Sequence, residues 1–250
     1  MVMQPQEKAV IALYEASGAV SDFKRSEATG SKSLRFTLAA MAAQGRDIKL
    51  SKQRVEGYRN FGTKLWNAAR FSQMNEARRV AGFDPASVDQ TINRWIRGEL
   101  TKAERAVSQA IEGGRFDDAA GALYRFVWNV FCDWYLELLK PILQAQSGDD
   151  GAEPQPSLAT ADADEAREVA GWALDQILVM LHPFMPFITE ELWHAMSDPA
   201  QPRAHDIIHA QWPEPNATID ADAVAETADA GWRITTAAQA GNGGHAGVVP

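Results

Sequence analysis

The segment from residue 51 to residue 71 constrains the fold of this 250-residue chain most, because its side chains repeat with the period of an α-helix. Wound as a helix, it places on one arc the side chains that suit a core: Val55, Tyr58, Phe61, Leu65, Trp66 and Ala69. The opposite arc carries basic and hydrogen-bonding side chains: Lys52, Arg59, Thr63, Lys64, Asn67 and Arg70. Such a surface suits a polyanion, and the simpler alternative is a solvated helix face without a ligand.

Other segments also repeat apolar residues at helical spacing, and no set of segments alternates with the two-residue period of strands. The patterns predict helices over residues 33–43, 51–73, 88–111, 117–139, 164–181 and 186–196. Ser51 is expected to cap the second of these, and Pro141 to stop the fourth. Ile207-Ile208 is the one plausible short strand. The sequence therefore predicts an all-α fold, an antiparallel bundle of about five main helices.

The helix expected over residues 117–139 is the most apolar, which predicts that it forms the buried centre of the bundle. On its thin polar stripe, Asp133 and Glu137 are expected to form a buried structural network with Arg125. Six tryptophans lie within helical apolar patterns and are expected to pack in the core: Trp66, Trp95, Trp128, Trp134, Trp172 and Trp193.

Charge is distributed unevenly in this acidic chain, whose formal net charge is -9. Residues 24–79 hold 13 basic and 4 acidic side chains, whereas the rest of the chain holds 11 basic and 29 acidic ones. Such asymmetry focuses a positive field on one part of a molecule, which favours contact with an anionic partner.

Composition limits the other possibilities. The single cysteine, Cys132, cannot form an internal disulfide, and no apolar run reaches the length of a membrane span, so a cytoplasmic protein is expected. The five histidines make no recognised zinc motif, and no metal site is expected from them. The sequence offers no catalytic residue set either.

Several blocks of sequence occur in the order of one known family. The segments GRDIKLS, RVEGYRNF and TKLWNAARF resemble the start of the anticodon-binding helical domain of bacterial valyl-tRNA synthetases, which are class I enzymes. NRWI, FDDAAGALYRFVWNVFCDWYLELLKP, HPFMPFITEELW and AQWP follow in the same order. The resemblance covers about residues 34–213.

This resemblance implies a tRNA-binding module for anticodon recognition, which acts in valyl-tRNA aminoacylation within a complete enzyme. It implies a domain division into an unmatched segment at 1–32 and a helical bundle at 33–214, and the Ala/Gly-rich composition of residues 215–250 predicts a mobile tail. Within the bundle, residues 145–160 read as an acidic linker. The expected partners are tRNA of the valine type and, as one option, a separate catalytic synthetase chain.

Catalytic motifs of the family are missing. No HIGH-like motif is present, and only Ser31-Lys32-Ser33 is similar to the KMSKS loop. The chain alone is therefore expected to be inactive as a valine–tRNA ligase. ATP and Mg²⁺ serve the catalytic domain of the family, so no cofactor is expected in this chain. Two alternatives remain open: a non-catalytic protein-interaction module, and a degraded gene fragment derived from a synthetase.

The residues that match the family motif supply the candidate tRNA contacts. Arg59, Lys64 and Arg70 are expected to contact phosphates, with Lys52 and Arg46 as further candidates. Asn67 could read a base edge, because its amide both donates and accepts hydrogen bonds, and Phe71 could stack on a base. Alternatively, Asn67 and Arg70 hold bundle loops together, and the Phe71 ring makes a contact between helices.

Overall fold

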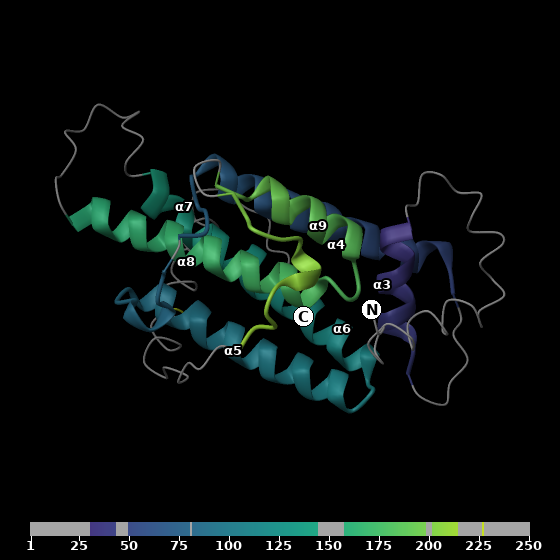
Figure 1. Ribbon diagram of the computed structural model, residues 1–250. Coiled ribbons are helices and arrows are strands. Elements are labelled where there is room, and N and C mark those ends of the chain that lie inside the picture. Colours follow the sequence, from purple (N-terminus) through teal and green to yellow (C-terminus); the bar gives the residue numbers. More distant parts are fainter. Residues whose placement is uncertain are drawn as a thin grey trace, which may run out of the picture.

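A computed structural model describes residues 31–43, 50–80, 82–144, 158–198, 202–214 and 227, and regular structure in these residues is helical (Figure 1). The elements are α3 (Ser31–Met41), α4 (Lys52–Met74), η1 (Pro85–Ser87), α5 (Thr91–Glu112), α6 (Phe116–Arg125), η2 (Phe126–Tyr135), α7 (Leu136–Gln144), α8 (Leu158–Leu181), α9 (Pro186–Ala195) and η3 (Ile207–His209). The prediction of an all-α helical bundle is confirmed.

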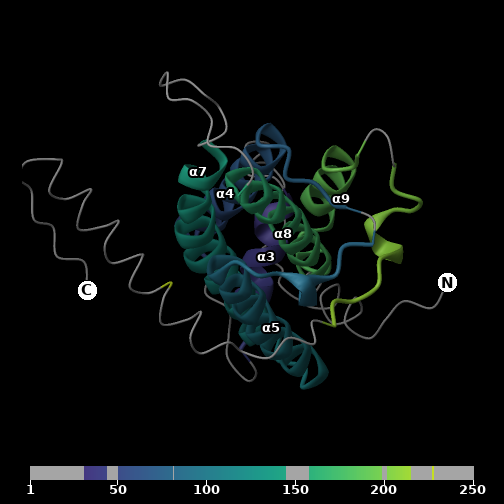
Figure 2. The ribbon, with the colours of Figure 1, turned by 90° about the vertical axis from the view of Figure 1, so that its left-hand side faces the viewer.

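Helix α8 lies at the centre of the bundle. Seen nearly end-on, it is surrounded by α4, α5, α7 and α9 (Figure 2), and it contacts all four of these helices. Its side chains are buried on nearly every side, as a central helix requires. In both views α5 lies on the side of the bundle away from α4 (Figures 1 and 2).

Helices α6, η2 and α7 form one unbroken helical rod, in which η2 is a π-helix. The expected stop at Pro141 is wrong, because the rod continues through this proline to Gln144. Pro141 removes one backbone hydrogen bond, and this loss falls close to the end of the rod, where few helical bonds remain to be broken. The rod lies beside α8, contacts α5 through both α6 and η2, and contacts α4 through η2.

The polar stripe of this rod is exposed, so the prediction of a buried polar network is wrong. Arg125, Asp133 and Glu137 are exposed, so they do not form a buried network, and Glu137 instead pairs with Lys140 at 2.6 Å. The polar stripe faces solvent because α8, not the rod, occupies the central position. Trp134 is 41% exposed for the same reason, and its assignment to the core is wrong. Four other tryptophans do pack in or against the core, as predicted: Trp95, Trp128, Trp172 and Trp193.

Helix α4 forms as predicted. The Ser51 side chain caps it by accepting a hydrogen bond from the backbone N–H of Arg54 at 3.3 Å. Its inner face buries Val55, Phe61 and Leu65 completely. Phe61 and Phe36 of α3 lie with ring centroids 5.0 Å apart, a contact that joins α4 to α3.

The residues from 202 to 214, which we call the C-terminal strap, cross over α8 and α9. The Arg203 guanidinium donates two hydrogen bonds to the Asp175 carboxylate of α8, at 2.9 and 2.6 Å, and lies 3.6 Å above the Trp193 ring of α9. Trp193 Nε1 donates to the backbone carbonyl of His205 at 3.0 Å. The strand expected at Ile207-Ile208 is wrong, because this part of the strap forms the single turn η3.

Some predictions concern residues that the structure does not describe. The segment 1–32 lies outside the described residues except for residues 31–32, which begin α3. The linker at 145–160 and the tail at 215–250 also lie outside them, except for residues 158–160, which begin α8, and residue 227. Among the described helices, none combines the length and the apolar character that crossing a membrane requires.

Candidate nucleic-acid interface

The outer face of α4 carries basic side chains that have no acidic partner among the described residues. Lys52, Arg59, Asn67 and Arg70 are exposed, and none of these side chains bonds to another residue in the described part of the chain. The alternative that Asn67 and Arg70 hold loops together therefore finds no partner among the described residues. With a rise of 1.5 Å per residue, Lys52 and Arg70 are roughly 27 Å apart along the helix axis.

Trp66 lies on this same face, contrary to the prediction that it packs in the core. Its side chain is 41% exposed. At 100° per residue, Trp66 lies within roughly 20° of Arg59 and 40° of Arg70 around the helix axis. The core-facing positions nearby are occupied by Phe61 and Leu65, so Trp66 is turned outward. The face thus combines cations, hydrogen-bonding groups and one aromatic ring; we call Lys52, Arg59, Thr63, Trp66, Asn67 and Arg70 the α4 face.

Lys64 differs from the other cations of α4. It is half-buried, forms an ion pair with Asp133 of η2, and its Nζ lies 4.3 Å from the centroid of the Trp128 ring. Its charge is therefore balanced within the bundle, at the edge of the α4 face. A phosphate must compete with Asp133 for this ammonium group, whereas no acidic side chain of the described residues pairs with Arg59 or Arg70.

The remaining candidates are placed differently. Phe71 is half-buried and packs against the core, so the contact between helices is present and only part of its ring is open to solvent. Arg46 lies outside the described residues. The one acidic residue of α4 is Glu56, against five basic residues in the helix, so the field along α4 is positive.

The polar groups behind this face serve the fold. Burial raises the pKa of the Cys132 thiol to about 12, so the thiol stays protonated and packs as a small apolar group. Burial likewise raises the pKa of Tyr135, whose hydroxyl donates to Asn93 Oδ1 at 2.9 Å. Neither group is exposed to a ligand on the α4 face.

A partly buried polar cluster that the sequence patterns did not reveal joins α5, α8 and, through Tyr135, η2. Asn93 Nδ2 donates to the Glu165 carboxylate at 2.9 Å, and the backbone N–H groups of Asp89 and Gln90 donate to the same carboxylate at 3.1 and 3.0 Å. Glu165 thereby satisfies free donors just before α5 begins. The three elements are remote in sequence, so helical periodicity carries no signal for this cluster.

Most of the helical bundle matches one known protein family. Residues 93–239 match the model of the family described as the anticodon-binding domain of tRNA ligase. The match covers most of the bundle and extends into the region that follows residue 214.

Individual relatives extend the similarity to α4. The chain is 59% identical over 208 residues to a valine–tRNA ligase of Caulobacter vibrioides. This match covers 83% of this chain and 21% of that protein. It is 55% identical over 184 residues to a valine–tRNA ligase of Rhizobium meliloti. This second match covers 74% of this chain and 18% of that protein. A match over 83% of 250 residues necessarily includes residues 52–74. The chain spans about a fifth of the length of these relatives.

Proposed function

The chain belongs to the anticodon-binding domain family of tRNA ligases, and on this basis we propose that it binds tRNA through the α4 face. Its valine–tRNA ligase relatives favour tRNA for valine as the RNA and the anticodon as the part that is read. The observation that carries the proposal is the exposed row of Arg59, Trp66 and Arg70 on one helix face. Cations bind phosphates, and an exposed aromatic ring stacks on unpaired bases.

The proposed reaction belongs to a larger assembly. ATP-dependent joining of valine to its tRNA requires a catalytic domain, which uses ATP and Mg²⁺ and lies outside the described residues. That domain belongs either to a longer polypeptide or to a separate catalytic chain. In both arrangements the bundle contributes recognition, and its place of action is the cytoplasm, which agrees with the single free cysteine.

Removing two cations from the α4 face should weaken tRNA binding in a salt-dependent way. For the double variant Arg59→Ala/Arg70→Ala, the slope of log K against log salt should fall by about two, because each lost phosphate contact lowers it by about one. The measurement is a filter-binding titration with valine tRNA at several salt concentrations. A control with the same change in charge removes two cations from α5, on the other side of the bundle, by Lys102→Ala/Arg105→Ala. Unlike Arg59 and Arg70, Lys102 forms an ion pair, with Glu99 at 2.6 Å.

The control variant should leave the salt slope nearly unchanged, since only phosphates near the α4 face are in contact. Equal losses in the two double variants would mean that net charge, not this face, determines binding. In that case the module would bind RNA without a defined site, and a protein-interaction role would become the better account.

Trp66 should contribute through stacking rather than through charge. Trp66→Ala is expected to weaken tRNA binding by about 1–3 kcal/mol, the usual value for loss of one base–aromatic contact. The salt slope should stay the same, because no phosphate contact is lost. Trp66→Phe should retain most of the affinity, whereas Trp66→Leu should behave like Trp66→Ala. Equal binding by Trp66→Leu and Trp66→Phe would exclude a stacking role.

Asp133 should restrain the RNA affinity of Lys64. Asp133→Asn removes the balancing charge and is expected to tighten tRNA binding and to raise the salt slope by about one. The same substitution in a Lys64→Ala background should have little effect, because no ammonium group is left to release. A double-mutant cycle of the four proteins measures this coupling. Independent effects of the two substitutions would show that Asp133 does not restrain Lys64.

A further inference from the structure

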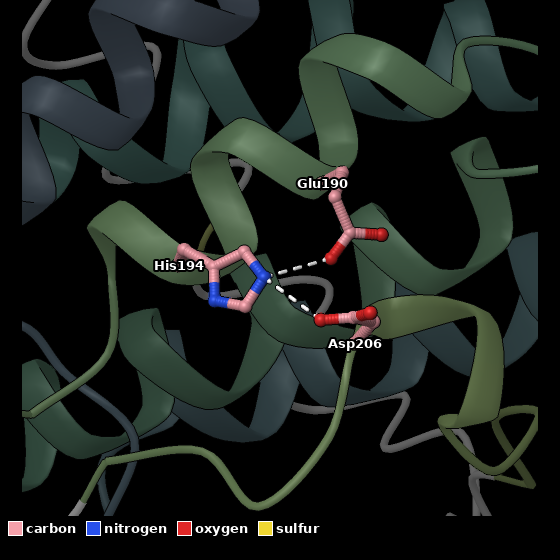
Figure 3. Close-up of side chains that lie close together, drawn as sticks. All are labelled: Glu190, His194 and Asp206. Carbon is pink, nitrogen blue, oxygen red and sulfur yellow. Dashed lines mark ion pairs between the residues drawn. The ribbon is translucent and has the colours of Figure 1, made fainter.

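Three side chains, one imidazole and two carboxylates, converge at the end of α9. Their chemistry differs from that of the cationic α4 face. Glu190 and His194 are separated by one helical turn on α9, and Asp206 reaches the same point from the C-terminal strap (Figure 3). His194 Nε2 lies 2.9 Å from Glu190 Oε1 and 3.2 Å from Asp206 Oδ1. All three atoms lie within 4.8 Å of one another.

The charge of this cluster is unbalanced when the imidazole is neutral. Two carboxylates then face a single ring nitrogen, and among the described residues neither carboxylate pairs with a lysine or an arginine. A neutral imidazole has one N–H, so it cannot serve as both a donor and a counter-ion for two carboxylates. The cluster lies at the last turn of α9, where the helix dipole also favours a positive charge. A cation at this point would satisfy all of these groups.

The geometry also fits a small transition-metal ion. Around tetrahedral Zn²⁺, with ligand bonds of about 2.0–2.1 Å, neighbouring ligand atoms lie about 3.3 Å apart. The two distances from the His194 nitrogen, 2.9 and 3.2 Å, are close to this separation. We propose that Glu190, His194 and Asp206 form a surface site for Zn²⁺, with water in the open coordination position.

The donor set selects among cations. One imidazole nitrogen and two carboxylate oxygens suit Zn²⁺, whereas Mg²⁺ and Ca²⁺ prefer oxygen ligands alone. The side chains of His194 and Asp206 are 53% and 66% exposed, so an ion can enter directly from solvent. The bound ion would add a link between the strap and α9 to the contacts already made there by Trp193 and Glu190.

Neighbouring contacts support the placement of the ligands. Glu190 Oε1 also accepts a hydrogen bond from the backbone N–H of Ile207 at 3.3 Å, which holds the strap beside α9. The backbone carbonyl of Asp206 accepts from the N–H of His209 at 3.0 Å and is 3.0 Å from His205 Nδ1. The two contacts of this carbonyl fix the turn of the strap at Asp206, and the hydrogen bond from Ile207 holds that turn beside α9. The cluster contains no short zinc sequence motif because its third ligand comes from a separate segment.

Calorimetric titration of the purified chain, made without a polyhistidine tag, tests the site with Zn²⁺ alone. We expect one Zn²⁺ to bind per chain and Mg²⁺ not to bind. The variants His194→Ala, Glu190→Gln and Asp206→Asn should each weaken Zn²⁺ binding at least about tenfold, since loss of an outer-shell partner already costs 10–100-fold. The matched control is His209→Ala, an exposed histidine of the strap outside the cluster, which should bind Zn²⁺ like the wild type.

Thermal unfolding provides a second readout for the same proteins. Zn²⁺ should raise the unfolding temperature of the wild type and of His209→Ala, but not that of His194→Ala, because a ligand of the folded state stabilises it by mass action. Acidification should weaken Zn²⁺ binding, because a protonated imidazole cannot coordinate a metal. The proposal is overturned if the wild type binds no Zn²⁺ at millimolar concentration. Equal Zn²⁺ affinity in the wild type and His194→Ala overturns it as well.

Discussion

Arg203→Ala is expected to destabilise the fold by about 3–5 kcal/mol, the usual effect of removing one partner of a buried ion pair. The Arg203 and Asp175 side chains are only 3% and 9% exposed, so the Asp175 carboxylate would be left buried without its hydrogen-bonding partner. The substitution also removes the cation above the Trp193 ring. The strap would then be held to α9 through Trp193 Nε1, Glu190 and the His194–Asp206 contact.

Urea denaturation of the wild type and Arg203→Ala gives this difference directly. Arg203→Lys keeps the charge but loses the paired hydrogen bonds, so its stability should be intermediate. The double variant Asp175→Leu/Arg203→Met leaves no buried charge and should be more stable than Arg203→Ala alone. If Arg203→Ala unfolds at the wild-type urea concentration, the pair does not hold the strap.

The loss of stability in Arg203→Ala should depend on pH. Burial raises the pKa of Asp175, and Arg203 opposes this rise through its hydrogen bonds and charge. Without Arg203 the pKa must rise further. A raised pKa in the folded state favours folding below the unfolded-state pKa, and this contribution is lost as the pH rises through the folded-state value. The stability deficit of Arg203→Ala should therefore shrink on acidification and be largest at neutral pH.

Gly171→Ala should have the second large effect on stability, because α8 touches another backbone at this residue. A Cβ atom on Gly171 would lie 2.4 Å from both the carbonyl carbon and the carbonyl oxygen of Arg78. These are backbone atoms, so no flexible side chain can move away. We expect a loss of about 1–3 kcal/mol or more, as for other overpacked interiors, measured by the shift in the urea midpoint.

Gly57→Ala provides the matched control within α4. A Cβ atom at Gly57 meets nothing within 4 Å, so only helix propensity changes. This substitution should stabilise the protein by up to about 1 kcal/mol. If Gly171→Ala lowers the stability and Gly57→Ala raises it, the close approach of Arg78, and not the loss of a glycine as such, causes the destabilisation. Similar effects of the two substitutions would contradict the packing of α8 against the segment that contains Arg78.

Helical periodicity predicted the elements well, because it depends on neighbours within one segment. It located α4, its Ser51 cap and its buried residues, including Val55, Phe61 and Leu65. Trp66 was assigned to the core for its apolar character, although its angle around the helix is close to that of Arg59. The 100° repeat alone does not decide its side, because Trp66 is also about 20° from Val55, which is completely buried.

Contacts between segments could not be predicted in this way. Lys64 and Asp133 are 69 residues apart in sequence, and their pairing depends on how α4 packs against η2. The same holds for Asp206, which joins α9 through the strap. Which helix occupies the centre of the bundle also depends on packing. For that reason the polar stripe of the rod was expected to be buried and is instead exposed.

Recognition of an anticodon by this bundle can be measured by comparing its affinity for two RNAs. The wild-type chain would be titrated by filter binding with valine tRNA and with the same tRNA carrying a different anticodon, at fixed moderate salt. We expect clearly tighter binding to the tRNA with the valine anticodon, and a smaller difference for Trp66→Ala. Equal affinity for both RNAs, or binding to neither by a folded chain, would contradict anticodon recognition by this chain.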